Sequence, residues 1–284
     1  MEENNPKRIY IRPKSGRFNL NIKELWRYRD LIALFVRRTF VAQYKQTVLG
    51  PAWAVIQPLF TTVIFTVVFG NVAKLDTGGV PHFVFYMCSN VLWCYFSACL
   101  TTTANTFTAN SAILGKVYFP RLVMPVSSVL SGLISYAIQM VFFLIIWAVY
   151  LIKGTSGIHA TWALVLVPLM IIETSMLGLG CGIIISALTT KYRDLAMLVN
   201  FGVQLWMYAS PVAYGSSQIS GGLKKIFMLN PMAPILDTYR YAFFGGETGI
   251  PWNYLIISAC VTAVVLVIGI ALFSRVEKTF TDTI

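Results

Sequence analysis

The residues that could take part in catalysis or metal binding are few and widely spaced. His82 and His159 are the only histidines, and no CxxC pair occurs. All five cysteines fall within apolar segments: Cys88, Cys94, Cys99, Cys181 and Cys260. This spacing excludes a metal site with ordinary ligand spacing. The sequence also lacks GxSxG, HExxH and a Gly-rich run ending in GK[ST]. We therefore expect no catalytic residue, no metal and no bound cofactor in this chain.

Glu173 is the one carboxylate that stands in the middle of a long apolar run. A charged side chain at the centre of a bilayer costs on the order of 3 kcal/mol and is a functional candidate by default. Two interpretations remain open. Glu173 lines a polar path, or it is a protonated or hydrogen-bonded residue that only holds helices together.

The composition is that of an integral membrane protein. Hydrophobic residues make up 57% of the 284 residues and charged residues only 12%, whereas soluble domains usually carry about 25% charged residues. The first 20 residues are basic and contain no apolar core. We therefore expect no cleavable signal, and the N-terminus belongs to the mature protein.

Six apolar segments are long enough to cross a bilayer, which requires about 20 residues. They lie at about 52–73, 82–104, 122–152, 160–188, 194–213 and 253–273. With six spans, both termini lie on the same side. Seventeen Lys and Arg residues fall on that side and five on the other, so the positive-inside rule makes it the cytoplasmic side. We predict an all-α, multi-pass protein of the cytoplasmic membrane.

The basic segment before the first span predicts an amphipathic helix. Residues 1–45 hold eleven basic and four acidic residues, a local charge of +7. From 22 to 45, apolar side chains recur at helical spacing: Ile22, Leu25, Trp26, Ile32, Val36, Phe40 and Tyr44. Next to a span, such a helix favours anionic membrane lipid over nucleic acid. The predicted organisation is a tail (1–21), an interface helix and junction (22–50) that ends at Gly50-Pro51, and a transmembrane domain (51–284).

Residues 214–252 are too polar and broken to span. We predict two short re-entrant helices there that dip into the outer leaflet between spans five and six, with bends at Gly221-Gly222 and Gly245-Gly246. Small residues at helical spacing predict close helix packing: Ser127, Ser131 and Ser135 in one span, and Gly178, Gly180 and Gly182 in the next.

Several aromatic side chains are candidates for a channel, in which flat rings stack on sugar rings, although most are expected in interface belts or packing. The candidates are Trp53, Phe60, Tyr86, Trp93, Trp206 and Tyr208.

Three stretches resemble one family. They are YRDLIALFVRRTFVAQYKQTVLGPAWAVIQPL at 28–59, KYRDL at 191–195 followed by QLWMYASPVAY at 204–214, and NPMAPILDTYRYAFF at 230–244. In this order they are similar to the membrane subunits of ABC exporters for cell-surface polysaccharides, the type-2 permeases that handle O-antigen and teichoic acid. One departure is Thr47, where the family often has Ser; the hydroxyl is kept.

The resemblance implies a six-span ABC-2 (type V exporter) fold that pairs with a second copy of itself and with two copies of a cytoplasmic ABC ATPase, which would hold ATP and magnesium. The cargo would be an undecaprenyl-type lipid-linked glycan. The segment 105–121 and the interface helix would couple to the ATPase, and segment 214–252 would gate the outer side. Coupling candidates are Arg37, Arg38, Asn110, Gly115 and Lys116; Tyr239 and Arg240 join Glu173 and the aromatic residues as channel or gate candidates.

Three alternatives stay open. A small-molecule or drug exporter of the same superfamily would lack the glycan-type junction motif. A gradient-driven flippase would need inverted repeats and several ionisable groups within the membrane, whereas this chain shows no repeat and one buried acid. A membrane-bound acyl or glycosyl transferase would need a His/Asp constellation near a span end, and the two histidines here are isolated.

Overall fold

The computed structural model describes residues 22–106, 109–110, 119–155, 157–189, 195–219, 221–246 and 249–280. Over these ranges the chain is helical, with no strand. The predicted tail 1–21 and two coupling candidates, Gly115 and Lys116, lie outside the described residues.

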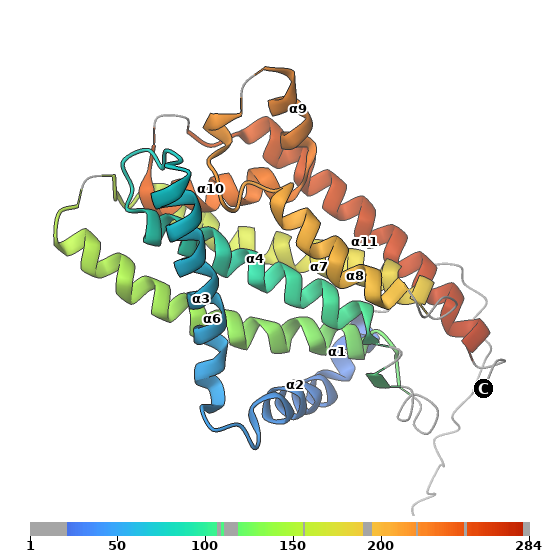
Figure 1. Ribbon diagram of the computed structural model, residues 1–284. Coiled ribbons are helices and arrows are strands. Elements are labelled where there is room, and N and C mark those ends of the chain that lie inside the picture. Colours follow the sequence, from blue (N-terminus) through green and yellow to red (C-terminus); the bar gives the residue numbers. More distant parts are fainter. Residues whose placement is uncertain are drawn as a thin grey trace, which may run out of the picture.

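Long helices form the body of the protein, one shorter helix runs beside them, and the other short helices lie at the two ends of the bundle (Figure 1). The long elements are α3 (Trp53–Phe65) with a π-helical continuation (Thr66–Val72), α4 (His82–Ala104), α6 (Val123–Ile152), α7 (Val167–Thr189) and α11 (Trp252–Phe280). The shorter helices are α1 (Ile22–Arg27), α2 (Arg29–Tyr44), α8 (Leu195–Tyr208), α9 (Gly222–Leu229) and α10 (Met232–Phe244).

Five helical segments of the described chain are long and apolar enough to cross a membrane, where the sequence predicts six. They are Gly50–Val72, His82–Ala104, Val123–Ile152, Trp162–Thr189 and Trp252–Phe273. The expected fifth span, 194–213, corresponds to α8, whose 14 residues extend about 21 Å at 1.5 Å per residue. The hydrocarbon core of a bilayer is about 30 Å thick. The six-span prediction is therefore not confirmed.

Helix α4 is the centre of the bundle, with α6 and α7 packed against it and α11 against α7. Close approach depends on glycine in α7. A Cβ at Gly178 would lie 2.7 Å from the Cβ of Cys99, and one at Gly182 would lie 2.5 Å from that of Thr103. Gly180 faces α11 in the same way, at 3.0 Å from the Cα of Leu266. The predicted packing role of these glycines is confirmed.

Pro58 lies inside α3, and side chains of α3 and α4 donate to its own carbonyl oxygen. Proline has no N–H, so it interrupts the helical hydrogen-bond ladder. The carbonyl oxygen of Pro58 accepts hydrogen bonds from Asn90 Nδ2 at 2.9 Å and from Thr62 Oγ1 at 2.8 Å. Pro58 is buried and the helix continues through it. The carbonyl of Pro58 therefore joins α3 to α4, which is the most buried of the five candidate spans.

The predicted amphipathic helix forms two pieces, α1 and α2, with a break at Tyr28. Part of its apolar side packs against the start of α6: the rings of Phe35 and Phe119 are 5.7 Å apart, and Val123 is fully buried beside them. Trp26, which the spacing places on the apolar face, is 70% exposed on the single chain, where the apolar side chain of an interface helix can contact lipid. Leu25 of α1 packs against the same apolar cluster as Leu31 and Ile32 of α2, so this part of the apolar face continues across the break at Tyr28.

Candidate functional site

The connections between helices gather at two opposite ends of the bundle. At one end, α1 and α2 pack beside the start of α6, and the last described side chain of α11, Phe273, lies close to Leu122. At the other end lie the loops 73–81 and 153–161 and the segment 209–251, whose described residues we call the cap. In the count of Lys and Arg residues, the three parts of the cap all fall on the side opposite the predicted cytoplasmic side.

Asn230 holds the end of α8 against the junction of α9 and α10. Its Oδ1 accepts a hydrogen bond from Trp206 Nε1 at 2.9 Å and from the backbone N–H of Met232 at 3.2 Å. Its Nδ2 donates to the carbonyl of Ala209 at 3.1 Å and to Ser210 Oγ at 2.8 Å. One side chain therefore bonds to the first backbone N–H of α10 and joins α10 to the end of α8.

The segment 214–252 contains two short helices, α9 and α10, as predicted. Gly221 and Gly245 both adopt positive φ, 70° and 71°, a conformation that side chains other than glycine rarely adopt. These glycines therefore mark the bends in front of α9 and after α10.

Arg240 is the only candidate gate residue with a charged partner in the described part of the chain. Its side chain is 6% exposed, and its guanidinium group donates to Asp237 Oδ1 at 2.6 Å and to the carbonyl of Tyr214 at 3.0 Å. It also lies over the ring of Phe85 at 4.8 Å, a cation–π contact with α4. Burial raises the pKa of the Tyr214 phenol to about 12, and the nearby Asp237 adds to the shift while Arg240 opposes it.

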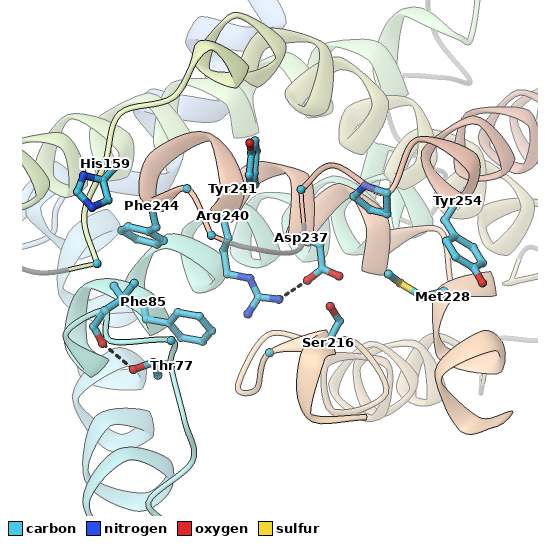
Figure 2. A pocket seen from close by; sticks show the side chains of 18 of the residues that line it. Thr77, Phe85, His159, Ser216, Met228, Asp237, Arg240, Tyr241, Phe244 and Tyr254 are labelled. Atoms are coloured by element: carbon cyan, nitrogen blue, oxygen red, sulfur yellow. Dashed lines mark hydrogen bonds and ion pairs between the residues drawn. The ribbon is translucent and has the colours of Figure 1, made fainter. Parts of the chain in front are cut away.

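A cavity of about 600 Å³ opens in the cap, and the Asp237–Arg240 pair lies in its wall (Figure 2). Its other walls come from loop 73–81, from His159 in loop 153–161, from Ser216, from Lys224 of α9 and from Tyr254 of α11. No pattern in the sequence indicates this cavity. An opposite charge three residues before Arg240 is a detectable pattern, but the partners from the other loops carry no comparable pattern.

Glu173 lies inside the protein, 8% exposed, near the same end. The Ser258 hydroxyl is 2.6 Å from Glu173 Oε1 and 2.8 Å from the carbonyl oxygen of Pro231. Glu173 therefore joins α7 to α11 and to the junction before α10. This is the arrangement that the second interpretation of Glu173 describes, a hydrogen bond that holds helices together.

The aromatic channel candidates fall into two groups. Trp53, Phe60 and Tyr208 are exposed on the single chain, at 47%, 64% and 52%. The others lie in the interior: Tyr86, Trp93 and Tyr239 are buried, and Trp206 is partly buried. In this conformation only the three exposed residues could line a channel that forms between this chain and a second protomer.

Three coupling candidates lie in the described part of the chain. Arg37 and Arg38 are exposed on α2. Asn110 is partly buried and donates from Nδ2 to the carbonyl of Thr106 at 3.0 Å. Their role in coupling stays a prediction.

Comparison with known proteins gives a consistent result. Residues 30–244 match the family model described as ABC-2 type transporter. The chain is 28% identical over 267 residues to the O-antigen export system permease protein RfbA of Myxococcus xanthus. The aligned region covers 93% of this chain and 98% of that relative. The chain is 26% identical over 254 residues to the protein of the same name from Klebsiella pneumoniae, with 89% and 94% covered.

Proposed function

The chain belongs to the ABC-2 type transporter family and is a permease subunit of an ABC exporter, and we propose that its cargo is a lipid-linked cell-surface polysaccharide of the O-antigen type. The observation that carries the proposal is the extent of the similarity. It covers 98% and 94% of two proteins named as O-antigen export permeases, and therefore includes both ends of the bundle and the cap.

We propose that ATP is hydrolysed by a partner and not by this chain. The sequence has no phosphate-binding loop, so ATP and magnesium would bind to a cytoplasmic ABC ATPase subunit, two copies of which would serve two copies of the permease. The exposed arginines Arg37 and Arg38 of α2 and segment 105–121 would be the contact surface. Part of α2 is fixed to α6 through Tyr44, whose hydroxyl is 3.2 Å from Ser135 Oγ, and this contact would transmit motion to the bundle.

The proposed orientation places both termini in the cytoplasm of a bacterial cell and the cap on the outer side of its inner membrane, as the charge count indicates. Helix α8 would then be a sixth, short crossing, and α9 and α10 would be re-entrant helices at the outer leaflet. The exposed aromatic residues of α3 and α8 (Trp53, Phe60 and Tyr208) support a glycan path between two protomers, with flat rings available on its wall.

The test is gentle detergent extraction of the chain from its native membrane, followed by native mass measurement and by an assay of polysaccharide on the cell surface after deletion of the gene. We expect two copies of this chain with two copies of an ATP-binding protein, and loss of the surface polysaccharide on deletion. A lone dimer without ATP-dependent activity, in cells that keep their polysaccharide, would contradict the proposal.

A further inference from the structure

Asn90 of α4 is a buried amide whose hydrogen bonds extend to a second membrane-spanning helix. Its side chain is 1% exposed. The amide nitrogen Nδ2 donates to the carbonyl oxygen of Pro58 at 2.9 Å and to Thr62 Oγ1 at 3.3 Å. The amide oxygen Oδ1 accepts from Cys94 Sγ, within α4, at 3.7 Å. The nitrogen and the oxygen of this amide therefore both have partners, as a buried polar group at membrane depth requires.

Helix α3 has little other directional attachment to α4. An 18-residue apolar window of Gly50–Val72, which contains α3, is 22% buried, compared with 78% for the window of His82–Ala104. Among the described residues, no other side chain of α4 donates a hydrogen bond to α3. The rings of Phe65 and Tyr86, 6.3 Å apart, add an apolar contact. Asn90 therefore fixes where α3 lies along α4.

Pro58 makes α3 easiest to bend directly before the point that Asn90 holds. Because proline has no N–H, the carbonyl of Ala54, four residues earlier, receives no helical hydrogen bond from it. The first turn of α3 lies before this gap, and the carbonyl of Pro58 lies after it. The hydrogen bond from Asn90 therefore holds only the part of α3 beyond the gap.

The two parts of α3 are connected to different elements at the end of the bundle where α1 and α2 lie. The first turn follows the short helix Gly50–Ala52 and, before it, α2 with the exposed Arg37 and Arg38. The part beyond Pro58 is held to α4, which leads at Ala104 directly into segment 105–121. Each of the two surfaces proposed to contact the ATPase is therefore connected to a different part of α3.

We propose that Asn90 is a positioning residue for export, which fixes the part of α3 beyond Pro58 to α4. Motion of segment 105–121 then moves the exposed ring of Phe60 together with α4, while Trp53 in the first turn moves with α2, and α3 bends between them. The inference rests on the proposed function, because the partner ATPase supplies the motion and these two rings belong to the proposed glycan path.

The first test compares two variants that each remove one hydrogen bond from the same carbonyl. Asn90→Leu removes the bond from α4 and keeps the bond from Thr62 Oγ1 at 2.8 Å. Thr62→Val is the matched control, because it removes the bond within α3 and keeps the bond from Asn90 to Pro58. Polysaccharide export, ATP hydrolysis and Tm are measured for both variants in the complete exporter.

We expect the polysaccharide exported per ATP hydrolysed to fall by about fivefold in Asn90→Leu, the change that one neutral hydrogen bond gives in a two-state equilibrium. In Thr62→Val this ratio should equal that of the parent. A purely structural role would move Tm and leave the ratio unchanged. The same ratio in both variants, whether lowered or unchanged, overturns the proposal.

Pulsed electron paramagnetic resonance tests the attachment without a change at Asn90. Spin labels on p-acetylphenylalanine, which spares the native cysteines, are placed at Thr102 of α4 and at either Phe60 or Trp53, all of them exposed. Dilution with unlabelled chain leaves the distances within one chain. We expect ATP binding to change the distance from 53 to 102 and not the distance from 60 to 102.

An equal change in the two distances, or no change in either, overturns the proposal and leaves the proposed function intact. A parent chain that binds no ATPase, in cells whose surface polysaccharide does not depend on it, overturns the proposed function itself.

Discussion

Removal of the Asn230 side chain is the sharpest test of how the cap is built. The substitution Asn230→Ala deletes four hydrogen bonds: three join Asn230 to the end of α8, and the fourth is accepted from the backbone N–H of Met232 at the start of α10. Each bond contributes about 1 kcal/mol net, and since one of the four is exposed to solvent, we expect a loss of about 3 kcal/mol. For a chain of this size, that corresponds to a decrease in Tm of about 6–12 °C.

The assay is thermal unfolding of the detergent-solubilised complex, followed by tryptophan fluorescence. Asn253→Ala is the matched control, because Asn253 is an exposed asparagine at the start of α11 and its removal should change stability by less than about 0.5 kcal/mol. Asn230→Asp keeps the acceptor for Trp206 and loses both donated bonds, so its Tm should lie between those of the parent and Asn230→Ala. If Asn230→Ala melts within about 2 °C of the parent, Asn230 does not hold the cap together.

Three further predictions follow from single contacts. Glu173→Gln should leave export and Tm unchanged, because the glutamine amide can keep a hydrogen bond to Ser258, to which it would donate where the carboxylate accepts. A loss of export at normal Tm would indicate a role of Glu173 in a polar path. Gly182→Ala should lower stability by about 1–3 kcal/mol in thermal unfolding, since its Cβ would lie 2.5 Å from the Cβ of Thr103. Gly202→Ala in α8, which meets nothing within 4 Å, should instead raise stability by up to about 1 kcal/mol. Arg38→Glu should reduce ATP-driven export without reducing the amount of chain in the membrane, and normal export by this variant would remove Arg38 from the coupling surface.

The long helices could be predicted from the sequence because each is a continuous apolar run between breakers. The length of α8 could not. The run predicted as 194–213 stays apolar beyond Tyr208, but the described helix ends there, three residues before Pro211, which disfavours helix in the residue before it. Hydropathy cannot distinguish an apolar helix from the apolar turn that follows it.

The candidate site could be predicted only in part. Arg240 and the Asn230-Pro231 start of α10 stand in one short stretch, and sequence patterns detect such local features. The cavity combines that stretch with Thr77, His159 and Tyr254, which are separated from it by whole helices. Only the packing of the bundle brings these segments together, and a single sequence contains no direct record of that packing.

The contacts of the cap also restrict how it can move. The start of α10 is joined to α8 through Asn230, and to α7 and α11 through the Ser258 hydroxyl, which lies between Glu173 and Pro231. Later in α10, Arg240 is joined to the chain beyond α8 through the carbonyl of Tyr214, and to α4 through the Phe85 ring. A displacement of α8 would therefore pull on α10 at two points ten residues apart. Helix α10 would tilt as a rigid element, and because Asp237 lies between those two points, the same tilt would reshape the cavity. Opening of the cap and a change in the shape of the cavity would then be one movement.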